Sequence, residues 1–514
     1  ISQTMVLEFG EKYVRFHTQG QTVLGANGQP YEIATPYLEA DLFEIHYVQS
    51  ADVMTLVHPN YPPKELRRYG ATDWRLVDIR FGSSLSAPSG LSASQTINQE
   101  VKNPTDYKRT YAVTALLADG TEESVRSSSV TLDCNPYGDG SYNTIRWNAV
   151  AGAGLYRVYR DQGGVWAYVG QTDTTQIVDE NITPDASITP PIYDTVFKNN
   201  DYPGAVSYFE QRRWFGGTRD RPNNLWATRP GTEADMSYSL PSQSDDRIAV
   251  RVAAREANRI LHIVPLSQLM LMTGAAEWRV SPLNSDAITP ESMSVRPQSY
   301  VGASNVQPLV VGSSMIYGAG RGGHLRELGY NYEAGGYISG DVCLRAPHLF
   351  DNLTIVDLAY SKAPSPVVWA VSSSGKMVAM AYVPEQQVGG FSTIETKGSI
   401  ESACVVAEGD EDIVYVEVMR TVNGQAVRFV ERMNERQYKD LKECVYVDCA
   451  ATYRGEAKKE ITGLTWLEGE TVSILADGAV EPQQVVKDGK ITLTYPAEIV
   501  HVGLPFTADM KTLP

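Results

Sequence analysis

The segment from residue 260 to 433 repeats one pattern, in which an apolar strand is followed by a turn and a second strand. The pattern occurs four times, in residues 260–280, 306–328, 355–383 and 400–433. A period of about 40 to 50 residues with one or two hairpins per unit is typical of β-propeller blades. Long helical periodicity is hard to find, so we expect an all-β fold with a β-propeller-like core. A set of unrelated sheets is the alternative.

The first 84 residues carry similar hairpins, and the sequence after residue 434 differs from both. A hairpin over residues 5–17 turns at Gly10–Glu11, and further strands are predicted at residues 42–47, 52–57 and 74–81. Prolines at three of the positions 58–63 predict a rigid corner there and exclude a central strand. We expect four parts: propeller residues 1–84 and 186–434, an insert at 85–185, and a small β domain at 435–514.

The insert has the patterning of a β-sandwich. Trp147 on one predicted strand, with Tyr156 or Tyr159 on the next, resembles the core pair of a fibronectin type III domain. Residues 111–124 resemble the penultimate strand of that fold and the turn after it, but they precede the tryptophan strand. We expect one circularly permuted sandwich, because about 100 residues is the size of one such domain. Two abutting half-modules are the alternative.

The last 80 residues contain two predicted features. Acidic–glycine pairs at Glu468–Gly469, Asp477–Gly478 and Asp488–Gly489 separate alternating runs and predict three hairpin-type turns. Residues 435–442 have the pattern of a short helix. The sequence starts at Ile1 without methionine and ends at Pro514 without a capping signal, so we interpret it as an interior portion of a longer gene product.

The net charge of −17 limits the ways in which this chain can meet nucleic acid. A protein that grips DNA by its phosphates is expected to be basic, because counterion release drives that binding. An acidic channel wall instead repels phosphate and lets DNA slide. The charge therefore excludes a protein that holds DNA statically. It does not distinguish a protein that never meets DNA from one that lets DNA pass through a channel. No apolar run approaches the ~20 residues of a membrane helix, and no secretion signal is visible.

Residues that could carry catalysis or bind a metal are present but not in productive patterns. The five cysteines form no CxxC pair, and no two of the seven histidines are three or four residues apart. Acidic clusters at Asp245–Asp246, Glu122–Glu123 and residues 408–412 have no identifiable catalytic partner, and the glycine-rich run at 318–323 reads as a turn. We therefore expect no enzymatic activity, no catalytic residue, no metal and no cofactor.

A cluster of arginine and tryptophan in residues 208–231 is the candidate interface. Arginine stacked on tryptophan is common where protein surfaces meet, between subunits or between blades. Solvated arginines on a core hairpin are the alternative. The candidate residues are Arg212, Arg213, Trp214, Arg219, Arg221 and Trp226.

Five segments together resemble the tail nozzle protein, also called tail tubular protein B, of short-tailed bacteriophages. They span nearly the whole chain, in the order that the family has them: residues 58–74, 208–231, 274–278, 461–478 and 491–506. The resemblance implies a structural protein of the virion tail, made in the bacterial cytoplasm and assembled as a ring of typically six copies. It also implies contacts with the adaptor ring and the tail fibres or spikes, and transient contact with the exiting genome. A glycan-binding or glycan-cleaving propeller or adhesin is the competing hypothesis.

Overall fold

The computed structural model describes residues 4–97, 103, 105–194, 196–253, 258–383 and 388–510. The two ends of the sequence, on which the expectation of an interior portion depends, lie outside these residues. Within these ranges, no helix is long and apolar enough to cross a membrane.

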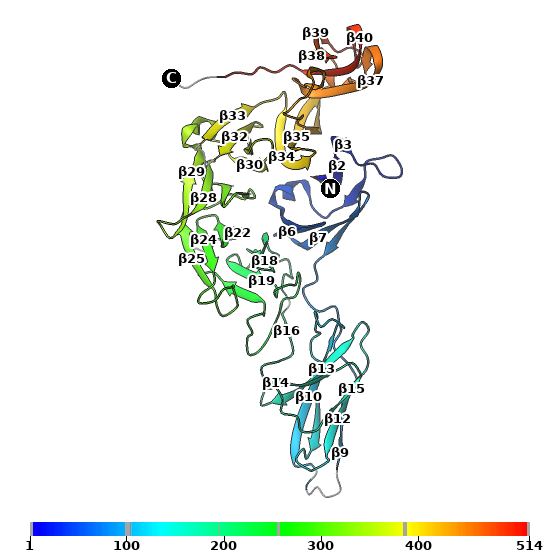
Figure 1. Cartoon of the computed structure of the whole chain (residues 1–514), viewed down its shortest axis with the longest axis vertical. Helices are drawn as coiled ribbons and strands as arrows, with labels where there is room; N and C mark the ends of the chain where they lie inside the picture. The colour runs from blue at the N-terminus through cyan, green and yellow to red at the C-terminus, as the bar shows by residue number, and fades with distance from the viewer. Residues whose placement is uncertain are drawn as a thin grey trace.

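Seven antiparallel sheets in the described residues form a closed ring (Figure 1), which confirms the propeller-like, all-β fold. We number the sheets as blades 1 to 7 in chain order. Blades 1 and 2 contain β1 (Val6–Gly10), β2 (Tyr13–Thr18), β3 (Gln21–Thr22) and β4 (Glu32–Ala34), then β5 (His46–Ser50), β6 (Val53–His58), β7 (Tyr61–Gly70) and β8 (Asp73–Asp78).

The later blades follow after the insert. Blade 3 contains β17 (Ala205–Phe209), β18 (Arg212–Gly216), β19 (Asn224–Ala227) and β21 (Ile248–Arg251). Blade 4 contains β22 (Ile260–Pro265), β23 (Leu269–Thr273), β24 (Glu277–Ser281) and β25 (Ser294–Ser299). Blade 5 contains β26 (Leu309–Val311), β27 (Ser314–Gly318), β28 (Leu325–Asn331) and β29 (Gly336–Asp341).

Blades 6 and 7 complete the ring, and short elements connect the blades. Blade 6 contains β30 (Ile355–Ser361), β31 (Val367–Ser372), β32 (Met377–Val383) and β33 (Val388–Ile394). Blade 7 contains β34 (Ser399–Glu408), β35 (Glu411–Val422) and β36 (Gln425–Arg432). The connecting elements are a small ladder of β16 (Ile192–Tyr193) with β20 (Ser237–Tyr238), and the 3-10 helices η1 (Glu39–Glu44), η2 (Val342–Arg345) and η3 (Pro347–Leu349).

A separate apolar cluster fills each boundary between neighbouring blades. Trp214 and Leu225 of blade 3 pack against Ile263 and Trp278 of blade 4, for example. Because each blade is covered on both faces, middle strands such as β23 and β31 are apolar on both sides. The ring closes where Val6 of blade 1 meets Ile413 of blade 7.

The insert is a two-sheet sandwich that leaves the ring between blades 2 and 3. Trp147 and Tyr156 are both buried in its core with ring centroids 5.4 Å apart, which confirms the expected core pair. The hairpin of β10 and β11 precedes β12 in the chain, yet β10 lies beside β13, as a permuted order requires. The strands are β9 (Ser92–Thr96), β10 (Tyr107–Leu116), β11 (Val130–Cys134), β12 (Tyr142–Arg146), β13 (Leu155–Gln162), β14 (Val165–Thr172) and β15 (Gln176–Asp179).

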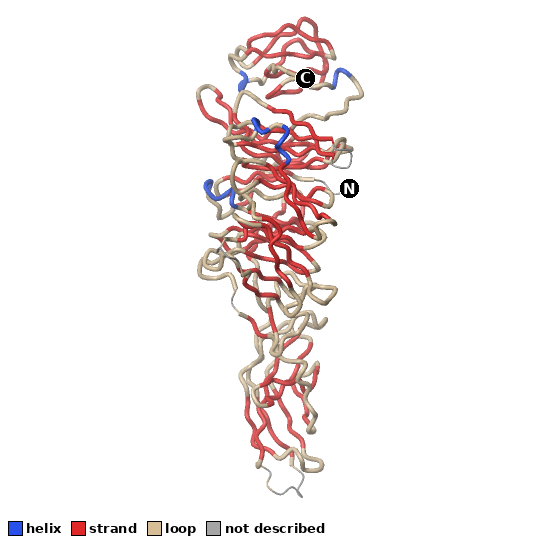
Figure 2. Tube along the Cα trace, turned by 90° about the vertical axis from the view of Figure 1, so that its left-hand side faces the viewer, coloured by secondary structure: helices blue, strands red, loops and turns tan. Residues whose placement is uncertain are grey.

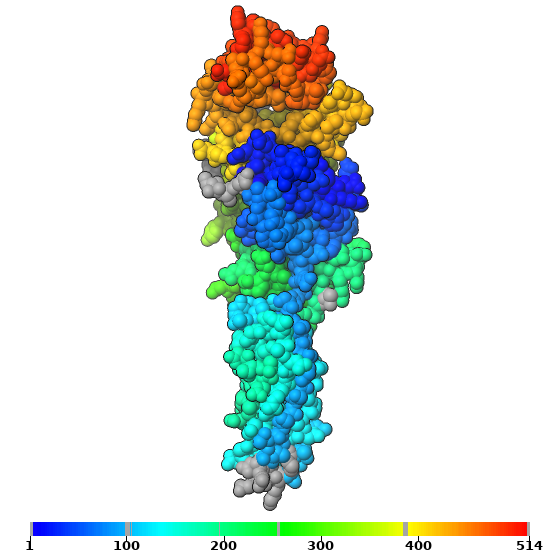
Figure 3. Space-filling view, turned by 90° about the vertical axis from the view of Figure 1, so that its right-hand side faces the viewer, coloured from blue at the N-terminus to red at the C-terminus, as the bar shows by residue number. Residues whose placement is uncertain are grey.

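A four-stranded sheet with its own core ends the described chain, and we call it the C-terminal β unit. Of the three predicted hairpin-type turns, Asp477–Gly478 joins two paired strands. Asp488–Gly489 and Glu468–Gly469 are turns between elements that do not pair with each other, so these two hairpins were predicted wrongly. The molecule is elongated, with the sandwich at one end, the propeller seen edge-on in the middle and the C-terminal β unit at the other end (Figure 2, Figure 3). The unit contains β37 (Asp448–Thr462), η6 (Thr465–Leu467), β38 (Thr471–Ala476), β39 (Ala479–Val485) and β40 (Lys490–Leu504).

The helix predicted at residues 435–442 is wrong, because that segment is irregular up to the 3-10 turn η5 (Leu441–Glu443). The backbone N–H groups of Arg436 and Gln437 each donate to the carboxylate of Glu411, at 2.9 Å. These tertiary hydrogen bonds hold residues 433–447 as a strap between blade 7 and the C-terminal β unit. Tertiary contacts of this kind routinely override helix propensity.

Two expectations for the first 84 residues also need correction. β7 pairs with both β6 and β8 and is therefore a central strand, although it begins with Tyr61–Pro62–Pro63. The prolines are tolerated because they lie at the start of the strand, beside a register shift between Leu56 and His58. The strand predicted at 42–47 is instead the end of η1 followed by the start of β5.

Candidate functional site

Blade 3 contains all six candidate interface residues, and its strands are covered from both sides. Every residue of β18 is buried. Because successive side chains in a strand point to opposite faces, Trp214 joins the core shared with blade 4 and Phe215 joins the core shared with blade 2. Trp226 is 3% exposed and lies in the same core as Phe215. The aromatic part of the cluster therefore packs between blades.

Arg213 is fully buried and links two blades. Its guanidinium pairs with Glu65 of β7 at 2.8 Å and with Glu233 at 2.5 Å, and its Nε donates to the hydroxyl of Tyr208 at 3.0 Å. Burial alone would raise the pKa of Glu65, but hydrogen bonds from Arg213 and Arg67 outweigh it and hold that pKa below its usual value. Arg213 therefore makes a contact between blades 2 and 3, and its side chain is not solvated.

Arg212 is also buried, but it binds backbone oxygens instead of carboxylates. Its guanidinium donates to the carbonyls of Thr228, Ser244 and Asp246 at 2.7–3.1 Å. Burial lowers the pKa of Arg212, although nearby carboxylates act in the opposite direction. Because arginine stays charged even so, this side chain ties the loop before β21 to β18 and β19.

The two remaining arginines reach the surface. The side chains of Arg219 and Arg221 are 57% and 40% exposed, and they pair with Asp220 and Asp201. Arg221 also stacks over the ring of Trp226, with 4.7 Å between its guanidinium carbon and the ring centroid. Of the six candidates, these two present charge to solvent, and their contact with another subunit stays a prediction.

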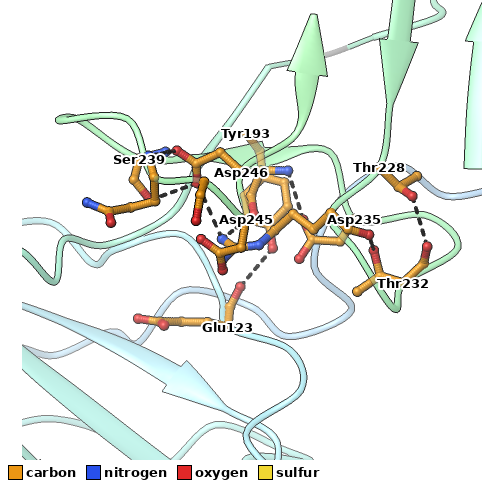
Figure 4. A network of polar contacts seen from close by, with 12 residues as sticks. Glu123, Tyr193, Thr228, Thr232, Asp235, Ser239, Asp245 and Asp246 are labelled. Atoms are coloured by element: carbon orange, nitrogen blue, oxygen red, sulfur yellow. Dashed lines mark hydrogen bonds and ion pairs between the residues drawn. The ribbon is translucent and has the colours of Figure 1, made fainter. Parts of the chain in front are cut away.

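A polar network at the base of the sandwich joins the insert to blade 3 (Figure 4). The hydroxyl of Tyr193 donates to the backbone oxygen of Glu123 at 2.9 Å, and Arg229 pairs with Asp245 and Asp246. Asp246 is 1% exposed and accepts hydrogen bonds from the backbone and the hydroxyl of Ser239. These carboxylates therefore hold loops in place.

The other acidic clusters are also occupied by structural partners. Glu123 accepts hydrogen bonds from Thr114 and Tyr159 and pairs with Arg157. Glu408 accepts from the hydroxyl of Tyr415 and pairs with Arg432, at the turn between β34 and β35. A catalytic acid or base needs an open face toward substrate, and these groups are already engaged by their own chain.

The folded chain brings together two histidines that look scattered in the sequence. His46 of β5 and His262 of β22 have ring centroids 4.6 Å apart. The ring nitrogens of His46 lie 2.6 Å from the carbonyl oxygen of Gly204 and 2.8 Å from that of Asn305, and Nε2 of His262 lies 2.8 Å from the carbonyl oxygen of Ser304. This cluster therefore ties together blade 2, blade 4 and the segments that lead into blades 3 and 5.

We predict that mild acid destabilises the propeller through this histidine cluster. Burial lowers the pKa of His46, and it lowers that of His262 well below 6.5. The stabilisation from a neutral His262 is fully present above about pH 6.5 and is lost as the pH falls toward its lowered pKa. Urea denaturation at pH 7.5 and 5.5 checks this. The variant His262→Asn should lose less stability between these two pH values than the native chain, and equal losses would contradict the prediction.

Three weak acids on three different blades interact with one another. Tyr47, Asp357 and Cys404 lie on β5, β30 and β34 and interact electrostatically. Removal from water raises the pKa of Asp357 to about 6 and that of Cys404 to about 12. Tyr47 is 47% exposed. The Cys404 thiol therefore favours its neutral form, which is the opposite of what an activated nucleophile requires.

Neither cysteine nor acidic residues form a metal centre in the part of the chain that the structure describes. All five cysteines are free thiols. No group of three or more histidine, cysteine, aspartate or glutamate side chains is arranged to hold a metal ion among the described residues.

Comparisons with known proteins return propellers and no family. No protein-family model matches the chain, and no curated protein matches it. Apo AztD from Citrobacter koseri is 7% identical with a TM-score of 0.36, covering 84% of this chain and 94% of its own. Sqt1 from Saccharomyces cerevisiae is 10% identical with a TM-score of 0.30, covering 90% and 95%. Structures this distant indicate no function for the chain.

Proposed function

We propose that this chain is a structural subunit of the tail nozzle of a short-tailed bacteriophage. In this role, copies form a ring, typically of six, distal to the portal and its adaptor ring. The ring carries tail fibres or spikes and surrounds the channel through which the genome leaves. The chain acts as a scaffold and not as an enzyme.

The main support is the position of the five segments that resemble the nozzle family. They lie in blades 2, 3 and 4 and in the C-terminal β unit, where they supply buried residues such as Trp214, Trp278 and Val502. A resemblance carried by core residues reports a shared fold. The carboxylates of the acidic clusters, such as Glu123, Asp246 and Glu408, are engaged by structural partners, which favours a scaffold over a catalyst.

The charge of the chain supports a conduit. Six chains would together carry about six times the charge of −17. An acidic wall repels the phosphates of DNA over a Debye length of about 8 Å, so the duplex stays mobile in the channel. We therefore expect acidic residues along the lumen and no continuous basic stripe.

The oligomeric state tests the proposal. We expect electron microscopy and mass measurement of the purified chain to show rings of about six copies with an open axial channel. The rings should bind duplex DNA weakly, without the steep salt dependence of a phosphate-gripping protein. A monomer that cleaves a bacterial surface polysaccharide, and loses that activity on a single carboxylate substitution, would overturn the proposal and favour the glycan hypothesis.

A further inference from the structure

The boundary between blades 1 and 7, which we call the seam, differs from the other boundaries in the ring. Blade 1 is built wholly from residues 6–34 and blade 7 from residues 399–432, so no strand is shared across the seam in the described chain. Every other pair of neighbouring blades is consecutive along the polypeptide, with the sandwich inserted between blades 2 and 3. The seam is therefore closed by non-covalent contacts alone.

The apolar contact across the seam is small. Its cluster has three buried members, Val6, Ile413 and Tyr415, with three partly buried residues packed against them. The boundary between blades 3 and 4 buries fourteen residues in its cluster. The boundary between blades 1 and 2 also has three buried members, but nine partly buried residues pack against them. Because apolar burial is the main stabilising contribution between packed sheets, the seam has the least apolar stabilisation of the described boundaries.

A polar groove of about 280 Å³ occupies the space beside this cluster. Side chains of blades 1 and 7 face each other across it, including Glu8, Arg15, Glu417 and Arg428. Burial and the neighbouring Glu401 raise the pKa of Glu417, and its distance to Arg428 is 3.7 Å. The groove therefore contains an incompletely compensated carboxylate at the seam.

The polar contacts that cross the seam are few and mostly exposed. The hydroxyl of Thr4 donates to the carbonyl of Ala407, and the backbone N–H of Gly20 donates to the hydroxyl of Tyr415. Arg428 pairs with Glu39 at 3.0 Å, with side chains 51% and 62% exposed. Exposed pairs of this kind contribute about 0–1 kcal/mol each and weaken with salt.

We propose that the propeller opens at the seam, so that blade 7 and the C-terminal β unit swing away from blades 1 to 3 and the sandwich. The C-terminal β unit would follow blade 7, because Lys397 pairs with Glu470 across their boundary and residues 433–447 strap the two together. Opening would therefore change the separation of the two ends of the molecule. It takes place within one chain and does not depend on the nozzle assignment.

Thiol labelling of two adjacent core positions tests the opening directly. Ile413 and Val414 are neighbours in β35 and are each 2% exposed, but Ile413 faces the seam and Val414 faces blade 6. We expect a maleimide to label the thiol introduced by Ile413→Cys about tenfold faster than that introduced by Val414→Cys, with labelling followed by mass spectrometry of the β35 peptide because the chain has five native free thiols. Local unfolding of β35 would label both at one rate, and that result would overturn the proposal.

A surface charge change should alter the opening without touching the core. Adding Arg428→Gln, or raising the salt concentration, should speed labelling at position 413 by about threefold and leave position 414 unchanged. Arg75→Gln is the matched control, since Arg75 pairs with Asp73 on the β7–β8 hairpin, away from the seam. Equal effects of the two arginine substitutions would count against the seam.

The separation of the two ends supplies a second readout. Spin labels at Val165→Cys in the sandwich and Val480→Cys in the C-terminal β unit sit at exposed positions. We expect a distance distribution that broadens when Arg428→Gln is added. A single narrow distance, unchanged by that substitution, would show that the ring stays closed.

Discussion

Replacing Arg213 by methionine is expected to destabilise the propeller by about 3–5 kcal/mol. The guanidinium is fully buried between blades 2 and 3, and it neutralises Glu65, whose side chain is 6% exposed. Methionine fills a similar volume but leaves the Glu65 carboxylate buried without its main partner. Such a charge must be protonated or rehydrated, and either change opposes folding.

Two further variants separate charge from packing in this prediction. Adding Glu65→Gln to Arg213→Met removes the stranded charge and should recover more than half of the loss, because replacing both partners of a buried pair is far less costly than removing one. Arg219→Met, at a side chain that is 57% exposed, should change stability by less than about 0.5 kcal/mol. The midpoint of urea denaturation reports each value. If Arg213→Met lowered the free energy of unfolding by less than about 1 kcal/mol, the Arg213–Glu65 pair would be hydrated or dispensable for stability.

The position of Arg213 also shows what the sequence could and could not predict. Strand and turn patterns around Trp214 and Phe215 predicted a core hairpin, since alternation and aromatic content are local properties. The partner of Arg213 is Glu65, 148 residues earlier and on another blade. No local pattern contains that pairing, so the same arginine could be read as solvated or as an interface residue.

The histidine cluster was missed for the same reason. His46 and His262 have no metal-ligand spacing in the sequence, and the closing of the ring brings them together. The repeat period predicted the blades because each blade is a local unit of consecutive hairpins. Which side chains of different blades meet depends on the geometry of the whole ring. A repeat period carries no information about that geometry.

Truncating Trp147 to alanine is expected to cost the sandwich about 3–5 kcal/mol and to leave the propeller intact. Trp147 is 5% exposed and packs against Tyr156 in a core whose members all lie between Leu85 and Ile177. Since no propeller side chain belongs to that core, the sandwich should unfold in a separate, earlier transition. Chemical denaturation followed by circular dichroism, and by protease digestion of the insert, resolves the two steps. Excising the insert at its two connections should leave the second transition unchanged.

Phenylalanine at position 147 is the informative control. The indole N–H of Trp147 is buried without a hydrogen-bond partner, and such a group costs about 1–3 kcal/mol. Trp147→Phe keeps an aromatic ring beside Tyr156 and removes that donor, so it should cost less than about half as much as alanine. If both substitutions cost the same, the core would depend on the indole itself. If both transitions shifted together, the sandwich and the propeller would be one cooperative unit, joined through the contacts of Tyr193 and Glu123 at its base.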